Sequence, residues 1–241
     1  MVAIFKKEMR AYFTTPMGYI FLAVSLFVSS FLFALTTYFQ EEPTSNTGTY
    51  FSYLIFVLAI LLPVLTMRSF SEERRTKTDQ LLFTSPVSIF SLVLGKFLAA
   101  VCMFLVYLGL SMINLIPIFA NVALGANEPN VAVIVGNLIA IILVGICFIA
   151  IGIFASALSE NPAVSFIITL GILAGFLVIN LFNAYIEIGW IRAVLSWLSI
   201  YGRFVNFTYG IFDIGALVYY ISITGIFLFL TERLFQVRRL G

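Results

Sequence analysis

The residues able to do chemistry in this chain are concentrated in one polar stretch, residues 67–96. It holds five of the thirteen basic and three of the eleven acidic residues (Arg68, Arg74, Arg75, Lys77 and Lys96; Glu72, Glu73 and Asp79). Charges of both signs suit ion pairing and the orientation of a protein partner. The chain has no His, the commonest general base and transition-metal ligand. Gly95-Lys96 lacks the earlier Gly and the following Ser or Thr of a phosphate-binding loop, so any ATP chemistry must belong to a partner.

The elements around this stretch must be membrane helices, because the composition is far too apolar for a water-soluble domain. Hydrophobic residues make up 62% of the chain, charged residues 10%, and the mean hydropathy is +1.11. Typical soluble domains carry about 25% charged residues. The net charge of only +2 gives no reason to expect nucleic acid as a partner. Cys102 and Cys147 each fall inside an apolar run and are interpreted as packing residues rather than a disulfide.

Six apolar segments contain no Lys, Arg, Asp or Glu: residues 17–39, 50–67, 97–119, 131–158, 163–182 and 214–231. A helix needs roughly 20 apolar residues, with about 17–25 usual, to cross the hydrocarbon of a bilayer. A β-barrel would instead show polar positions alternating along segments of about ten residues. The sequence therefore predicts an all-α integral membrane protein with six transmembrane helices.

The distribution of basic residues predicts which side of the membrane each connection occupies. The connections at residues 40–49 and 121–130 contain no Lys or Arg. Three basic residues precede the first apolar segment, five lie in the polar stretch and three follow the last segment, which places eleven of thirteen on one side. The positive-inside rule then puts both termini in the cytoplasm of a multi-pass plasma (inner) membrane protein.

Three shorter segments complete the predicted layout. Residues 1–15 place apolar side chains on one helical face among charges, which is typical of an amphipathic helix on the membrane surface. Residues 159–162 form a very short link, and Pro162 suits the first turn of the next helix. Residues 183–213 are long, aromatic and poor in charge, which predicts short interfacial or re-entrant helices. Their aromatic residues fit a membrane anchor at least as well as a substrate gate.

Within the polar stretch, residues 69–72 (Ser-Phe-Ser-Glu) fit a capping box that starts a short helix. Glu73 and Lys77 stand four residues apart, in the order that favours an ion pair on a helix. Leu81–Phe83 supply apolar side chains, and Pro86 is suited to the start of a second helix. Such a charged helix followed by apolar groups suits docking into a partner. A solvated loop whose basic residues touch lipid headgroups is the alternative.

The same stretch resembles a known family, the permease subunits of type-2 ABC exporters. Ten residues match its pattern F-x-x-E-R-x-x-x-T-x-x-L-L-x-x-P-V followed by G-K: Phe70, Glu73, Arg74, Thr78, Leu81, Leu82, Pro86, Val87, Gly95 and Lys96. Residues 201–213 look like the family's segment before its last helix. In size and layout the chain is similar to the permeases of gliding-motility and nitrous-oxide-reductase maturation loci. Lys77 stands where many relatives have Gly, which predicts a helical rather than a bent turn.

The resemblance implies one permease domain over residues 1–241 and a coupling helix seated in a separate ABC ATP-binding subunit. It assigns the ATPase-coupling role to eight residues: Phe70, Glu72, Glu73, Arg74, Thr78, Leu81, Leu82 and Phe83. ATP and Mg would bind the partner ATPase, with no cofactor in this chain. The further implied partners are a second permease copy or paralogue, membrane lipid and an auxiliary subunit. The amphipathic N-terminal helix would be the family's connecting helix, and the first, second and fifth spans would line the dimer seam.

Other function classes have weaker support in the residues. An ATP-independent channel, transporter or scaffold subunit remains an alternative, although ion-coupled transport usually leaves carboxylates inside the membrane. An intramembrane enzyme would need ionisable groups within the spans. Asn114, Asn137 and Asn180 more often hold helices together than catalyse. Small residues four apart, at 152 and 156 and at 171 and 175, let helices approach closely and serve either the fold or a dimer. The sequence does not indicate the cargo.

Overall fold

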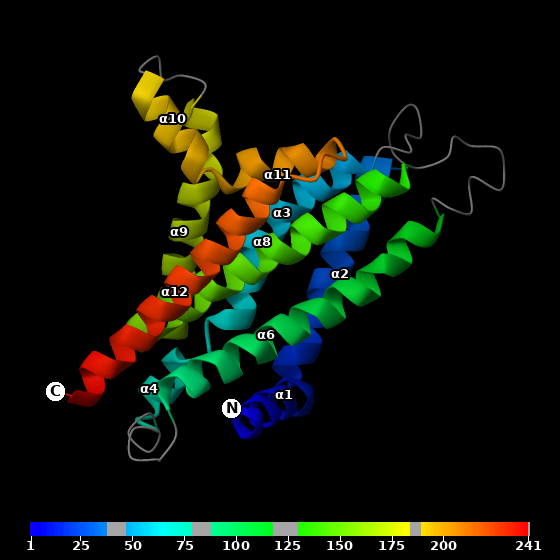
Figure 1. The fold of residues 1–241 in the computed structure, drawn as a ribbon. Helices are drawn as coiled ribbons and strands as arrows, with labels where there is room; N and C mark the ends of the chain where they lie inside the picture. Colours follow the sequence, from blue (N-terminus) through cyan, green and yellow to red (C-terminus); the bar gives the residue numbers. More distant parts are fainter. Residues whose placement is uncertain (38–46, 79–87, 118–129, 184–188, 241) are drawn as a thin grey trace.

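The computed structural model describes residues 1–37, 47–78, 88–117, 130–183 and 189–240, and these ranges form helices joined by short turns (Figure 1). In chain order the helices are α1 (Val2–Thr14), α2 (Pro16–Thr37), α3 (Gly48–Thr66), α4 (Ser71–Arg75), α6 (Ile89–Ser111), η1 (Met112–Leu115), α8 (Val131–Leu158), α9 (Pro162–Asn183), α10 (Gly189–Leu198), α11 (Ile200–Thr208) and α12 (Ile214–Leu240).

Six of these helices are long and apolar enough to cross a membrane, which confirms the predicted number: α2, α3, α6 with η1, α8, α9 and α12. The helix predicted to start near Pro86 and the third span form one continuous helix. Helix α6 begins at Ile89, so Lys96, which set the start of the predicted apolar segment, lies inside the helix with only 3% of its surface exposed. A charge ended the predicted span, whereas in the fold that charge is neutralised by neighbouring elements.

Helix α8 is the centre of the bundle and packs against α3, α6, α9, α11 and α12. Close approach to α3 depends on Gly152, where an added Cβ would overlap the Thr66 hydroxyl. The pair at 152 and 156 therefore serves the fold, while Gly171 and Gly175 on α9 have open space around them. Cys147 is buried on α8 as a free thiol, and Cys102 is free and partly buried, which confirms the packing interpretation.

The outer helices expose large apolar side chains, as a surface in contact with lipid requires. Phe27 on α2, Ile167 on α9 and Ile214 on α12 are 72%, 66% and 68% exposed. Soluble monomers rarely expose continuous apolar surface of this kind. The chain is therefore a multi-pass membrane protein.

The two ends of the bundle carry different elements. Helices α1 and α4 and both termini lie at one end, and α10 and α11 at the other (Figure 1). The described part of residues 183–213 confirms the predicted short helices. Helix α11 buries Ile200, Phe204 and Phe207 against the bundle, whereas Trp190 and Trp197 of α10 are exposed.

The connection from α11 to α12 turns sharply at Gly210, whose φ of +76° suits glycine. The Asp213 carboxylate then starts α12 by accepting the Gly215 N–H at 2.8 Å and the Asn206 side-chain amide at 3.1 Å. These bonds favour the ionised carboxylate: the Asn206 bond, more than any other contact, lowers the pKa of Asp213. Tyr220 of α12 donates to the Ile200 carbonyl at 2.9 Å and joins the two helices again.

Candidate functional site

The N–H groups at the start of the five-residue helix α4 donate to an acceptor on a distant helix. Its N-cap residue is Phe70, which offers no side-chain acceptor. The backbone N–H groups of Phe70 and Ser71 instead donate to the Ser156 hydroxyl on α8, at 2.9 and 3.1 Å. That hydroxyl donates in turn to the Met67 carbonyl at 3.1 Å. The predicted capping box was therefore wrong, because a buried tertiary acceptor satisfies the helix start in place of a local one.

Lys96 provides the main charge contact of α4, within what we call the Lys96 cluster (Lys96, Glu8, Glu73 and the Ser69 carbonyl). The ammonium donates to Glu8 Oε1 at 2.8 Å, to Glu73 Oε1 at 3.0 Å and to the Ser69 carbonyl at 2.7 Å. An ammonium has three N–H groups, so all of its donors are used. These bonds offset the cost of burying the charge and tie α1, α4 and α6 to one another.

The predicted Glu73–Lys77 ion pair was wrong for two reasons visible in the structure. Glu73 is turned toward Lys96, with Lys7 of α1 also within 3.7 Å. Lys77 lies beyond the end of α4 with a φ of +56°, in the left-handed region. The turn is therefore bent rather than helical, even though Lys replaces the Gly expected there. Thr78 closes it by donating its backbone N–H to the Glu73 carbonyl at 2.9 Å.

Phe70 lies at the centre of these contacts and is 2% exposed. Its ring centroid is 5.1 Å from the Lys96 ammonium and 4.7 Å from the ring of Phe235 on α12. A cation over an aromatic face is attracted by the negative potential of the ring. The ring therefore joins α4 to α12 as well as to α6.

Arg74 connects α4 to the turn between α8 and α9. Its guanidinium donates to the carbonyls of Ala157 and Leu158 at 3.1 and 3.0 Å, and it pairs with Glu160 at 2.7 Å. The last carbonyls of a helix have no partner within the helix, and a cation there also interacts well with the helix dipole. Arg238 of α12 donates to the same Ala157 carbonyl at 3.0 Å. The end of α8 is thus held by two arginines from different helices.

A family model described as "ABC-2 family transporter protein" matches residues 28–231. The chain belongs to the ABC-2 transporter family. A search of curated proteins found no match. Membership makes the chain a membrane transport component and the permease subunit of an ABC transporter.

In this ABC-2 permease, the predicted coupling residues lie on two different sides of α4. Phe70, Glu73 and Arg74 face the bundle, and the side chains of Glu73 and Arg74 are only 17% and 14% exposed. Glu72 is half-exposed and Thr78 is exposed. Leu81, Leu82 and Phe83 lie outside the described residues, as does Pro86.

Sequence reasoning missed the other half of this site. Ser156, Glu8 and Glu160 all contact α4 or the Lys96 cluster, yet none was singled out for that role. Glu8 and Glu160 carried a usable signal, because each is an isolated carboxylate next to an apolar span. Ser156 gave a weaker one, since small polar residues are common in apolar helices. Of the three asparagines, Asn114 accepts from Ser30 at 2.9 Å between two helices, as predicted for a helix contact.

Proposed function

We propose that this permease is driven through α4 by a separate ABC ATP-binding subunit and uses that motion to export cargo or transmit force. The observation that supports this is the set of contacts converging on α4. A helix of five residues is held by α1, α6, α8 and α12, so it cannot move without displacing them. In layout the chain is similar to the permeases of gliding-motility and nitrous-oxide-reductase maturation loci.

The two sides of α4 have separate roles in this proposal. Glu72 and Arg75 have 44% and 63% of their side chains exposed, and Lys77 and Thr78 follow them on the surface. These exposed residues make the contact with the ATP-binding subunit. Phe70, Glu73 and Arg74 transmit the displacement inward, so they act in coupling without touching the partner.

The working unit consists of two permeases, as identical copies or paralogues, and two ATP-binding subunits that hold ATP and Mg. Residues 1–241 act as one permease domain. Closure of the ATPase pair moves α4, and the Lys96 cluster passes that motion to α1 and α6. Arg74 passes it to the turn between α8 and α9. The spans rearrange because short charge-assisted bonds resist separation from their partners.

Contact with the ATPase is tested by reversing charge on the exposed side of α4. Glu72→Arg together with Arg75→Glu should abolish co-purification of the ATP-binding subunit while the permease still inserts into the membrane. The control is Arg192→Glu on α10, at the opposite end of the bundle. Glu73→Arg is unsuitable, because it would place a second cation beside Lys96 and damage the fold itself. Normal co-purification of the double variant would refute docking through this face.

The orientation of the chain is part of the same proposal, with the end that carries α1, α4 and both termini in the cytoplasm. It rests on the clustering of basic residues at that end. A Cys at position 46, in a Cys102→Ala and Cys147→Ala background, should react with an impermeant reagent from outside only. A Cys at Lys77 should react only after the membrane is opened. The reverse pattern would overturn the orientation and with it the cytoplasmic docking of α4.

A further inference from the structure

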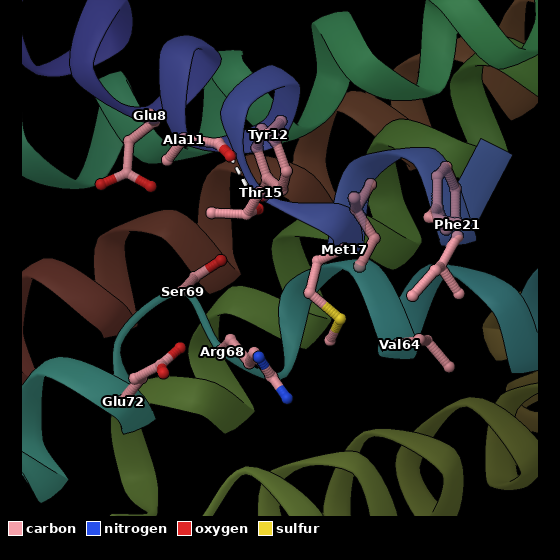
Figure 2. Close-up of a pocket in the computed structure, with 12 residues that line it drawn as sticks. Glu8, Ala11, Tyr12, Thr15, Met17, Phe21, Val64, Arg68, Ser69 and Glu72 are labelled. Atoms are coloured by element: carbon pink, nitrogen blue, oxygen red, sulfur yellow. Dashed lines mark hydrogen bonds between the residues drawn. The ribbon is translucent and has the colours of Figure 1, made fainter.

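A cavity of about 280 Å³ lies between α1, α2 and the end of α3, at the end of the bundle that carries α4. Its lining is polar and charged on one side and apolar on the other. Figure 2 shows Glu8, Ser69 and Glu72 on one side and Phe21 and Val64 on the other. We call this cavity the interfacial pocket.

The change in polarity follows depth in the bundle. Helix α2 begins at Pro16, so Phe21 lies about 7.5 Å further along the helix at a rise of about 1.5 Å per residue. Val64 precedes the end of α3 at Thr66 and belongs to the same apolar level. Glu72, by contrast, is on α4, beyond the end of that span. The pocket therefore runs from charged surroundings into the apolar part of the bundle, as an amphiphilic ligand requires.

The charged groups at the mouth differ in how far they are already neutralised. Glu8 accepts from Lys96 at 2.8 Å. Arg68 is exposed and has no hydrogen bond or ion pair within the described part of the chain. Glu72 pairs with Arg75 at 4.0 Å, its one ion pair among the residues that the structure describes. The pocket is thus lined by one guanidinium without a partner in the described part of the chain and by one carboxylate whose ion pair is long.

We propose that the interfacial pocket binds a phospholipid whose headgroup carries both a phosphate and a primary ammonium. Arg68 binds the phosphate, since a guanidinium forms paired hydrogen bonds to phosphate oxygens. Glu72 accepts from the ammonium, and the upper part of one acyl chain lies against Phe21 and Val64. The volume is near the lower limit of about 300 Å³ for ligand pockets, so the rest of the chain leaves the pocket past the exposed Ile20.

Other headgroups fit the same opening less well. An anionic headgroup without an amine would meet Glu72 and Glu8 with no cation to offer them. A quaternary ammonium has no N–H to donate to the Glu72 carboxylate. The order of binding is therefore phosphatidylethanolamine first, then phosphatidylcholine and phosphatidylglycerol. Glu72 serves both the lipid and the proposed ATPase contact, so the order is measured on the permease purified without an ATP-binding subunit, where its result does not depend on the proposed coupling.

The test is native mass spectrometry of the full chain, purified in detergent and supplied with each of these three lipids in turn. Phosphatidylethanolamine should bind with the highest occupancy. Arg68→Gln and Glu72→Gln should each weaken that binding about tenfold or more, as expected for the loss of a hydrogen bond to a charged group. Arg192→Gln, which removes a surface charge at the opposite end, should leave binding unchanged.

Equal binding of the three lipids, or unchanged binding in both pocket variants, would overturn the proposal. A second measurement uses the wild-type chain and so does not depend on how the variants fold. Hydrogen exchange of peptides covering residues 8–21 should be slower in phosphatidylethanolamine nanodiscs than in phosphatidylcholine nanodiscs. Identical exchange in the two lipids would also contradict the assignment.

Discussion

Lys96→Met is the sharpest test of the reasoning behind the site, because it removes the charge at the centre of the Lys96 cluster. The ammonium makes three hydrogen bonds and is 3% exposed. Breaking a buried ion pair by removing one partner costs about 3–5 kcal/mol. Glu73 then keeps only the exposed Lys7 ammonium, 3.7 Å from the same oxygen, and its second oxygen is buried without a partner within the described residues. We therefore expect Lys96→Met to lower the free energy of unfolding by about 3–5 kcal/mol.

The assay is unfolding of the purified permease in a mild detergent, followed by circular dichroism with increasing denaturant. Lys7→Met is the matched control: its ammonium is 3.7 Å from the same Glu73 oxygen but 68% exposed. An exposed pair contributes about 0–1 kcal/mol, so this variant should behave almost as wild type. Equal stability of Lys96→Met and wild type would refute the claim that buried charge holds α4.

The carboxylates provide a second readout of the same variant. Removing the ammonium leaves both Glu8 and Glu73 without the buried cation that they share. Adding Glu8→Gln and Glu73→Gln to Lys96→Met should therefore restore part of the lost stability, because the uncompensated charges are removed with little change in shape. No recovery in the triple variant would show that packing, rather than charge, accounts for the loss.

Three further predictions use the same unfolding measurement. Gly152→Ala should cost about 1–3 kcal/mol, because its methyl group overlaps Thr66, whereas Gly171→Ala has open space and should cost nothing. Lys77→Gly should raise stability by up to about 1 kcal/mol by relieving the left-handed backbone, and Lys77→Ala should not. Asp213→Ala should cost about 1 kcal/mol at pH 7. Since the folded pKa of Asp213 is lowered, its contribution is present above the unfolded pKa of about 3.9 and is lost as pH falls through the folded value.

The spans were predictable because each is an apolar run long enough to cross the bilayer, which is a property of local sequence. The start of α9 at Pro162 and the short helices α10 and α11 were also predictable, because they too depend on local sequence. Lys96 was not, because a charge in the sequence is the usual sign that a span has ended. Only the fold shows that Glu8, Glu73 and the Ser69 carbonyl surround it. The burial of a charge depends on partners that lie 88 and 23 residues away in the chain.

The local errors in the polar stretch share one physical cause. A capping box and an ion pair four residues apart are worth about 1 kcal/mol and a few tenths of a kcal/mol in an isolated helix. A short helix packed on a bundle can form stronger contacts instead, with Ser156 at its start and Lys96 on its side. Tertiary partners therefore replaced both local contacts. Lys77 has a backbone conformation that normally favours glycine, and the turn is closed on both sides by backbone bonds from Lys77 to Arg74 and from Thr78 to Glu73.

The residues of the family pattern and the exposed residues of α4 are largely different, which the sequence alone does not show. The pattern residues described on α4, Phe70, Glu73 and Arg74, face the bundle, and their partners are all in this chain. The positions that the pattern leaves open include Glu72 and Arg75, which are exposed. These three pattern residues therefore hold α4 on the bundle, whereas Thr78 of the pattern is exposed. If α4 docks on an ATP-binding subunit as proposed, the choice of that subunit depends on the exposed positions. Exchanging Glu72 and Arg75 between related permeases should then change which ATP-binding subunit is bound, while exchanging Glu73 should change only stability.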